Sequence, residues 1–464
     1  MQKYSLVLIP FLFVGCMSMA PEYVRPTAPI PSTFDVNTSV QKSNPQDLSW
    51  EAFIQEPSLQ AVVAQALEQS RDLKKAVANI EMARATYRVT RSAQFPSIDA
   101  SATGSKARSI SGESTAISES STATVGLSSY ELDFFGKVKS QSEASLESYK
   151  GVEEAEKTVR IALIAETINA WLSYASDTTL LHLAKQTEQS AKRSLEVVQK
   201  RVDLGVDTKV SLYNAQSIYQ QARVDVANYT TQVAHDRSAL ELLVGAKVAD
   251  VHLPKGLEEE AQAWLLDVPV GLSSEILLNR PDVLSAEHNL KSANANIGVA
   301  RAAYFPSITL TTKGGVGTNS LTGLFDGGTS KIWSFAPTVT LPIFDMGERD
   351  ANLDYAKAKK ALYLATYEAT IQTAFSEVER ALSRRATIFE QYDAQKALVE
   401  ANANSYAIYD ARYQKGVDTY LNALLSQRSF YSSQKAFINV RLEELINRVT
   451  LYRVLGGGIT QNQP

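Results

Sequence analysis

The chain has 464 residues with only 15 prolines and 22 glycines, so long uninterrupted elements are expected. Its formal net charge is −4 and its pI is about 5.8, which leaves no basic surface able to neutralise many phosphates. The composition therefore excludes nucleic acid as an expected partner.

The N-terminus indicates export. A basic start at Lys3 is followed by an apolar segment, 6–14, that is too short to span a bilayer as a helix. The single cysteine, Cys16, directly follows Gly15 and resembles the cysteine of a bacterial lipobox, whose thiol receives lipid. We expect residues 1–15 to be a lipoprotein signal peptide and Cys16 to carry covalent lipid. An ordinary signal peptide with an incidental cysteine is the alternative.

Residues 16–57 are expected to form an extended segment behind the lipid, because the prolines within 21–31 remove backbone donors and restrict their neighbours. A helical pattern follows from Ser58 to Arg91. Alternation with a period of two then predicts a strand pair at about 96–134. Within that pair, the Ser-, Thr- and Gly-rich stretch 109–121 is expected to be an exposed loop.

The longest predicted element is a helix over 138–204, which at 1.5 Å per residue would span about 100 Å. Such a length requires partners along its flank. Residues that are apolar except for Glu188 recur every seven positions along it, and apolar residues do so again after Gly205, which predicts an antiparallel helical hairpin with a coiled-coil seam. The hairpin completes a first unit at 58–244.

The second half of the chain repeats the first. The passage Arg201-x-x-x-Gly205-Val206-Asp207-Thr208 returns as Arg412-x-x-x-Gly416-Val417-Asp418-Thr419, and Phe95-Pro96-Ser97-Ile98 returns as Phe305-Pro306-Ser307-Ile308. The repeat predicts a second unit at 273–455, with a helix, a strand pair at about 306–344 and a long hairpin at 347–455. Residues 245–272 are expected to link the units, and 456–464 to form a flexible tail.

Four strands per chain are too few to cross a membrane alone, since about eight is the smallest number that closes a membrane barrel. Open sheet edges in lipid would leave backbone groups unpaired. No run of 18 apolar residues offers a membrane-spanning helix instead. The chain would therefore pool its strands with copies of itself, and dimers, trimers and tetramers all satisfy this condition. The alternative is a structural coiled-coil lipoprotein without a pore, whose short alternating stretches pack on helices.

Several motifs resemble landmarks of the TolC family of outer-membrane efflux channels, in its lipidated OprM/NodT-like branch. These motifs are Pro21-Glu22-Tyr23-x-Arg25-Pro26, Leu132-Asp133-Phe134-Phe135-Gly136, Asn279-Arg280-Pro281-Asp282-Val283, Ala293-Asn294-Ala295-x-Ile297-Gly298-Val299-Ala300-Arg301 with its continuation to Ile308, and Leu341-Pro342-Ile343-Phe344-Asp345. The resemblance covers nearly the whole mature chain. It implies a mixed fold, in which a homotrimer forms a 12-stranded membrane β-barrel, four strands per chain, continuous with a long α-helical coiled-coil tunnel in the periplasm.

The same resemblance implies function. Such a channel is no enzyme but a passive exit duct in the outer membrane of a Gram-negative bacterium. It would conduct drugs and other small toxic compounds from a periplasmic adaptor and an inner-membrane efflux pump of the RND type. The alternative within the family is a TolC-like exporter that serves protein secretion.

The two hairpin turns are expected to form the periplasmic end, where the adaptor would dock. Their residues are Gly205, Val206, Asp207, Thr208, Gly416, Val417, Asp418 and Thr419. Glycine permits the tight reversal, and Asp and Thr can cap the outgoing helix. The same residue types also suit a turn with no further role, which is the alternative.

By resemblance, Tyr413 and the stretch 420–428 lie just inside these turns, where threefold symmetry would repeat each inward side chain three times. Relatives tend to show Tyr-Leu-x-x-Leu-Asp-Ala-Gln-Arg, whereas Leu425 stands here at the acidic position. A ring of leucines closes by dewetting and lacks charge selectivity. We therefore expect an apolar gate of Leu421 and Leu425, unless both face the coiled-coil seam. Further gate candidates are Tyr413, Asp418 and Asn422.

No pattern indicates a catalytic or metal site. The four histidines are scattered without metal-ligand spacing, and neither a phosphate-binding loop nor a nucleophile elbow occurs. We expect no metal and no cofactor apart from the lipid on Cys16. Energy for transport would have to come from a partner.

Overall fold

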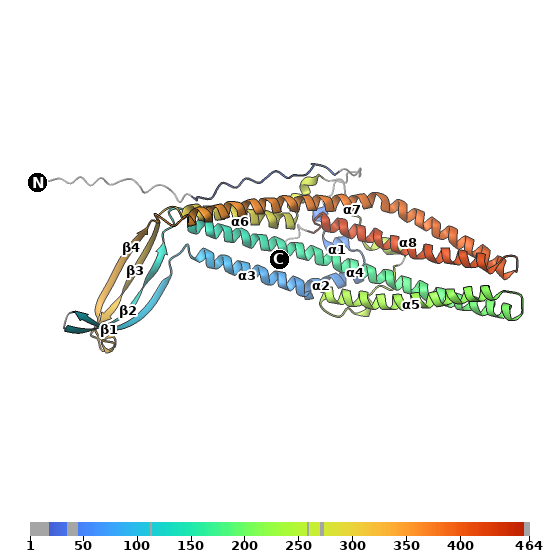
Figure 1. Cartoon of the computed structure of the whole chain (residues 1–464), viewed down its shortest axis with the longest axis horizontal. Coiled ribbons are helices and arrows are strands. Elements are labelled where there is room, and N and C mark those ends of the chain that lie inside the picture. The colour runs from blue at the N-terminus through green and yellow to red at the C-terminus, as the bar shows by residue number, and fades with distance from the viewer. Residues whose placement is uncertain (1–17, 35–44, 112–113, 258, 270–272, 459–464) are drawn as a thin grey trace. The chain divides into compact units, whose positions relative to one another are not determined.

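The computed structural model describes residues 18–34, 45–111, 114–257, 259–269 and 273–458. Cys16, the predicted signal peptide and the last residues of the predicted tail lie outside these ranges. Within them the chain forms one four-stranded sheet and a series of helices, of which α4, α5, α7 and α8 are the longest (Figure 1). The main elements are α1 (Trp50–Phe53), α2 (Pro57–Gln69), α3 (Arg71–Ser92), β1 (Ile98–Ser111), β2 (Ser114–Glu131), α4 (Lys137–Asp203), α5 (Lys209–Val244), α6 (Pro281–Ala302), β3 (Ser307–Thr318), β4 (Ser330–Thr340), α7 (Glu348–Gln414) and α8 (Tyr420–Val454).

The chain divides into two compact units, and each unit draws segments from both sequence repeats. The first unit contains the chain up to Thr27, Asn79–Glu153 and Ser285–Glu368, and so holds all four strands. The second contains Ala28–Ala78, Glu154–Leu284 and the chain from Ala369 onward, with both hairpin turns. The predicted boundaries at 58–244 and 273–455 therefore describe the sequence repeat, whereas the compact units cut across it.

The predicted unbroken helix over 138–204 is confirmed as α4, and α7 is its counterpart in the second repeat. Both helices end at a glycine in the left-handed region, Gly205 at φ +70° and Gly416 at φ +72°, where other residues would be strained. None of the helices in the described part of the chain is both long and apolar enough to cross a membrane.

The helix predicted from Ser58 to Arg91 is two helices, so that prediction was wrong at one point. The backbone becomes extended at Ser70, with φ −51° and ψ 132°, between α2 and α3. The end of α5 packs against this break, because a side chain at Gly245 would lie 2.7 Å from the carbonyl oxygen of Gln69. The interruption is imposed by a tertiary contact that helical periodicity does not reveal.

The four strands form one antiparallel sheet in the order β1-β2-β3-β4. The exposed loop predicted at 109–121 was wrong, because β1 extends to Ser111 and β2 already begins at Ser114. A Ser- and Thr-rich composition signals a polar surface, and it does not prevent strand pairing when β-branched Thr is common. The last strand ends at Thr340, short of the predicted 344.

Aromatic side chains form the core of the second unit. Trp171 of α4 is buried, and its indole N–H donates to the carbonyl oxygen of His252 at 2.9 Å. Its ring meets that of Trp264 edge-on at 5.0 Å, and Phe53 stacks on Tyr452 at 4.5 Å. His252 and Trp264 belong to the segment predicted as a linker between the repeats. That segment is therefore part of the core.

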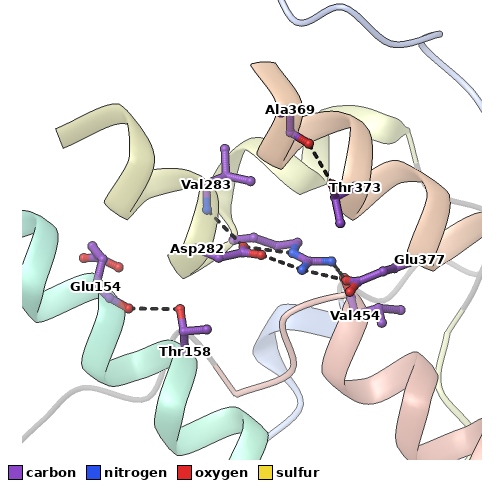
Figure 2. A network of polar contacts seen from close by, with 9 residues as sticks. Glu154, Thr158, Asp282, Val283, Ala369, Thr373, Glu377 and Val454 are labelled. Atoms are coloured by element: carbon purple, nitrogen blue, oxygen red, sulfur yellow. Dashed lines mark hydrogen bonds and ion pairs between the residues drawn. The ribbon is translucent and has the colours of Figure 1, made fainter. Parts of the chain in front are cut away.

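The Asn279–Val283 motif has a structural role in the second unit. The guanidinium of Arg280 donates to both carboxylate oxygens of Asp282 at 3.0 and 2.7 Å and to Glu377 at 3.0 Å. It also donates to the carbonyl oxygen of Val454 at 2.8 Å, at the last residue of α8. Figure 2 shows Asp282, Glu377 and Val454 converging on this point. One buried cation thus holds the start of α6, the middle of α7 and the end of α8 together.

Candidate functional site

The strand register sorts side chains onto two different faces of the sheet. Residues paired directly across antiparallel strands point to the same face, and successive residues alternate. Because Ala100 pairs with Val125, Val125 with Gly314 and Gly314 with Trp333, one face runs across all four strands. We call this the apolar face, since over most of its length it carries Ile98, Ala100, Ala102, Ala123, Val125, Leu127, Tyr130, Ile308, Leu310, Val316, Trp333, Phe335, Pro337 and Val339. Charged side chains, those of Lys106, Arg108, Glu119 and Lys331, stand on the same face toward the end where β1 turns into β2.

The opposite face is polar. It carries Asp99, Ser101, Thr103, Thr122, Thr124, Thr309, Thr311, Lys313, Ser334 and Thr338. Cross-strand hydroxyl pairs link Ser101 to Thr124 at 3.0 Å and Thr103 to Thr122 at 2.8 Å. Meanwhile Trp333 on the apolar face is 82 % exposed, although aromatic side chains are normally covered. An exposed apolar face backed by a hydroxyl-rich face is the pattern of a barrel wall between lipid and water.

The sheet also has two edges. Within the described residues β2 and β3 each pair with two neighbours, whereas β1 and β4 each pair with one. The outer backbone groups of β1 and β4 can therefore accept another strand. Joining the β4 edge of one copy to the β1 edge of another would continue the sheet.

The two predicted hairpin turns have the same backbone structure. The amides of Gly205 and Val206 donate to the carbonyls of Val202 and Arg201 at 3.0 and 2.9 Å. In the second turn the equivalent bonds run from Gly416 to Tyr413 and from Val417 to Arg412, again at 3.0 and 2.9 Å. These bonds satisfy the last carbonyls of α4 and α7. The valine of each turn is exposed.

The capping chemistry differs between the turns. The hydroxyl of Thr208 accepts from the amide of Ser211 at 3.2 Å and so caps α5, as predicted. Thr419 makes no side-chain cap to α8. Asp418 instead accepts from Asn422 at 2.8 Å and from Arg412 at 3.1 Å within its own hairpin. Its carboxyl pKa is lowered, first by the Asn422 bond.

Tyr413 joins the two hairpins. Its hydroxyl donates to Oδ2 of Asp207 at 3.0 Å, and the guanidinium of Arg201 lies 4.8 Å from the centre of its ring. The side chain is 6 % exposed, so Tyr413 points between the hairpins. Burial raises the pKa of its hydroxyl, and the Asp207 carboxylate adds to the shift. The phenol therefore stays protonated and remains a donor.

An apolar cluster lies around this link. It consists of Val198, Ala215, Tyr413, Tyr420, Ala423 and Leu424, with Leu195, Val202, Leu212 and Ile218 packed against it. Leu421 and Leu425 do not belong to it, because they are 52 % and 51 % exposed on another face of α8. Within one chain, therefore, these two leucines do not fill the coiled-coil seam. Asn422 is exposed beside them.

A second link of the same kind connects α5 and α8. The hydroxyl of Tyr431 donates to Oδ2 of Asp225 at 2.8 Å, and the ammonium of Lys435 lies 3.7 Å from the same oxygen. Asp207, Asp225 and Tyr431 were not predicted as a linking set. One signal was available, since Tyr413 occupies the position of Val202 in the first repeat. At this position the second repeat has a tyrosine that can donate a hydrogen bond, and the first repeat has an apolar valine.

The described part of the chain contains no group of three or more His, Cys, Asp or Glu side chains arranged to hold a metal ion.

Comparison with known proteins identifies this architecture. A family model described as "Outer membrane efflux protein" matches residues 62–246 and 272–457. The chain belongs to the outer membrane efflux protein family. It is 39 % identical to the solvent efflux pump outer membrane protein SrpC of Pseudomonas putida, over the whole of both chains. It is also 39 % identical to the outer membrane protein OprJ of Pseudomonas aeruginosa, with 97 % of this chain and 95 % of OprJ covered.

Solved structures show the same relationship. The open state of the MtrE outer membrane channel of Neisseria gonorrhoeae matches with a TM-score of 0.88 and 35 % identity, covering 96 % of this chain and 99 % of MtrE. The predicted resemblance to TolC-family efflux channels is thereby confirmed, together with the fold of four strands and long helices and the outer-membrane location. The two family matches lie close to the two predicted repeats.

Proposed function

We propose that three copies of this chain form one outer-membrane duct that passively conducts small toxic compounds out of the cell. The observation that carries this proposal is the sheet, with one apolar face, one polar face and two edges that can accept a partner. In lipid an unpaired backbone group costs several kcal/mol, so both edges must be filled. Pairing β4 of each copy with β1 of the next closes the wall.

The closed wall would place its two faces in different solvents. The apolar face, with Trp333, Phe335 and Val339, would contact lipid, and the hydroxyl-rich face would line an aqueous lumen. Twelve strands, the number that three copies supply, leave room for a pore wider than the small barrels of about eight strands. Nothing in such a pore consumes energy, so transport would be driven elsewhere.

The substrate class and partners follow from the relatives. SrpC is named as part of a solvent efflux pump, and a further relative, 39 % identical over 98 % of this chain, as part of an antibiotic efflux pump. We infer that this chain serves an inner-membrane pump, of the RND type, through a periplasmic adaptor. Apolar side chains exposed at the hairpin turns, Val206 and Val417, support the turns as the adaptor's docking surface.

The periplasmic end would be closed by the hairpins themselves. Leu421 and Leu425 are half exposed in one chain, so in a trimer their three copies could form an apolar constriction that dewets. The link from Tyr413 to Asp207 would hold the second hairpin against the first and keep that constriction narrow. Asp418, which is half-buried, and Asn422, which is exposed, lie on the second hairpin and would stand at its rim.

The lipid on Cys16 remains part of the proposal. Cysteine after Gly15 at the end of an apolar export segment supports it. Replacing Cys16 with Ala should abolish incorporation of labelled palmitate, and persistent labelling would refute this part.

Planar-bilayer recording tests the proposal. Purified protein should give discrete conductance steps, and a structural lipoprotein would give none. A deletion strain should become more sensitive to organic solvents and antibiotics and regain resistance on complementation. Unchanged sensitivity, in a strain whose other efflux ducts have been removed, would contradict the efflux assignment.

A further inference from the structure

Three cations stand at one end of the apolar face of the sheet, toward the turn between β1 and β2. They are Lys106 and Arg108 of β1 and Lys331 of β4, and all three are exposed. Glu119 of β2 is bonded to Lys106 across the strand pair. Among the described residues, which do not include Glu113 of the turn, neither Arg108 nor Lys331 has an ion-pair partner.

The charges at this end belong to the apolar face alone. Arg108 and Lys331 lie on the two edge strands, so β2 and β3 separate them within one chain. They can meet only where β4 of one copy pairs with β1 of the next, and the inference therefore rests on the proposed three-copy duct. Over the same stretch the opposite face carries only small residues, namely Ser105, Ala107, Ser109, Ala116, Ser118 and Ser120.

The junction between the two repeats shows how such edges pair. Where β2 meets β3, the amide of Leu132 donates to the carbonyl oxygen of Ile308 at 2.8 Å. Three residues further on, the ring of Phe135 stacks on Phe305 at 4.7 Å. Both contacts join the end of the first strand pair to the start of the second. The same residue types recur at the two open edges of the sheet.

The repeat carries this junction over to neighbouring copies. The two residues of the backbone bond correspond to Leu341, after β4, and Ile98, at the start of β1. The equivalent bond would run from Leu341 of one copy to Ile98 of the next. Neither β1 nor β4 has a bulge in its observed pairing, so antiparallel pairing from this bond places Lys331 opposite Arg108. This register also keeps the apolar faces of the two copies on one side.

The register brings like charges together. Side chains directly opposite in a strand pair have their Cβ atoms about 4.5–5.5 Å apart, and like charges at such positions are destabilising. Lys331 would face Arg108 of the next copy, with Lys106 of that copy on the diagonal. Glu119 already binds Lys106, so one carboxylate stands against three cations. An anion from outside the protein would relieve the repulsion.

The depth of the cluster indicates which anion. Lys331 lies ten residues from Leu341 along the strand. At about 3.4 Å per residue and a tilt of about 45°, ten residues rise about 24 Å, and the apolar band of a membrane barrel is about 25 Å tall. The cations therefore stand where the lipid tails end and the headgroups begin.

We propose that Lys331 of each copy, together with Lys106 and Arg108 of the next, binds the phosphate of an anionic lipid headgroup on the outer surface of the barrel. The planar guanidinium of Arg108 can bind two phosphate oxygens at once, and the ammonium groups add charge from either side. Each interface between copies would hold one such site. The lipid would thereby bridge two chains.

Native mass spectrometry of the trimer with added lipid tests this. Phosphatidylglycerol should bind at one molecule per interface, and phosphatidylcholine with the same acyl chains should bind more weakly. Arg108→Gln with Lys331→Gln should weaken phosphatidylglycerol binding roughly tenfold or more, since each cation near an anionic lipid surface strengthens binding severalfold. Lys313→Gln, on the polar face of β3, is the matched control. Arg108→Lys with Lys331→Arg retains the charges and should bind like the parent.

Equal binding of the two lipids by an intact trimer would overturn the site and leave the duct standing. So would equal affinity of the parent and the Gln variant. Displacement of the lipid by inorganic phosphate would mean a general anion site and would also overturn the lipid assignment. A folded monomer would instead contradict the proposed duct itself.

The strand pairing has its own test. With Lys331→Cys and Arg108→Cys in one chain, a short bis-maleimide should link the copies covalently, and neither single variant should be linked. Lys331→Cys with Ala102→Cys is the control, because Ala102 lies on the same face but six residues along β1. Linking of this second pair, or of neither pair in a confirmed trimer, would place the cations apart and overturn the proposal.

Discussion

The hydroxyl of Tyr413 donates a hydrogen bond of 3.0 Å to Asp207, and this bond joins the last turn of α7 to the turn between α4 and α5. It connects two hairpins that the sequence repeat makes alike. The equivalent carboxylate of the second hairpin, Asp418, is bonded to Arg412 and Asn422 of its own hairpin. The two turns therefore have the same backbone conformation, but their aspartate side chains accept hydrogen bonds from different partners.

Removing this link should favour opening of the proposed gate. Tyr413→Phe deletes only the hydroxyl, and a hydrogen bond to a charged group contributes about 1.5–3 kcal/mol. We expect open-state occupancy to rise roughly tenfold or more in planar-bilayer recordings. Tyr409→Phe, at a tyrosine with a more exposed side chain on α7, is the control and should leave gating unchanged. Indistinguishable traces from both variants would show that the link does not restrain the tips.

The apolar constriction makes a separate prediction. Leu421→Ser combined with Leu425→Ser should wet the narrowest point and raise single-channel conductance. Leu398→Ser, at another exposed leucine of the second unit, should have no effect. Unchanged conductance in the double variant would remove these two leucines from the gate.

The two faces of the sheet can be tested with neighbouring residues. Trp333→Arg places a charge on the apolar face, where a barrel facing lipid loses about 2–4 kcal/mol at the bilayer midplane. Ser334→Arg places the same charge on the polar face and should be tolerated. Both variants are folded into lipid vesicles and titrated with urea. We expect only Trp333→Arg to lower the urea concentration at which the protein unfolds. Equal sensitivity of both variants would contradict the assignment of the faces.

A pair of carboxyl groups between α4 and α5 predicts a pH effect. Burial and the neighbouring Asp236 raise the pKa of Asp177 to about 7. Oδ2 of Asp236 is buried without a hydrogen-bond partner, so we expect a proton held by Asp177 to serve both carboxyl groups. In the unfolded chain Asp177 titrates near pH 4. The folded state therefore retains a proton that the unfolded state releases, and stability falls as pH rises from about 4 to about 7.

Asp177→Asn places an amide N–H donor beside Asp236 and removes the carboxyl group that titrates. Its melting temperature should exceed that of the parent by roughly 2 °C at pH 8, and the difference should vanish below about pH 4, after allowance for solvent screening. Glu166→Gln, at an exposed carboxylate of the same helix, should show no such trend. A difference that is constant with pH would mean that the pair shares no proton. Circular dichroism melts at several pH values measure this directly.

Much of the fold follows from the sequence because its causes are local. The long helix α4 is unbroken since no proline interrupts it, and its end at Gly205 is set by one residue that tolerates positive φ. The break at Ser70 could not be predicted, because it depends on the packing of Gly245. The length of β2 was missed because serine and threonine suit both loops and polar strand faces.

The candidate site was predicted in part for the same reason. The turn residues recur in both repeats, so their positions were evident, and glycine geometry accounts for them. The link between Tyr413 and Asp207 joins residues far apart in sequence, and no spacing rule reports such a contact. The role of Gly298 was likewise hidden, since a helical glycine reveals its purpose only when Ala20 and Ser140 are seen to lie close to it.

Native mass spectrometry of the purified protein in mild detergent tests the central claim most directly, which is that the edges of β1 and β4 are filled by other copies. The account predicts a stable complex of three chains that persists on dilution. A fully folded monomer, with its strands intact by infrared spectroscopy, would contradict it.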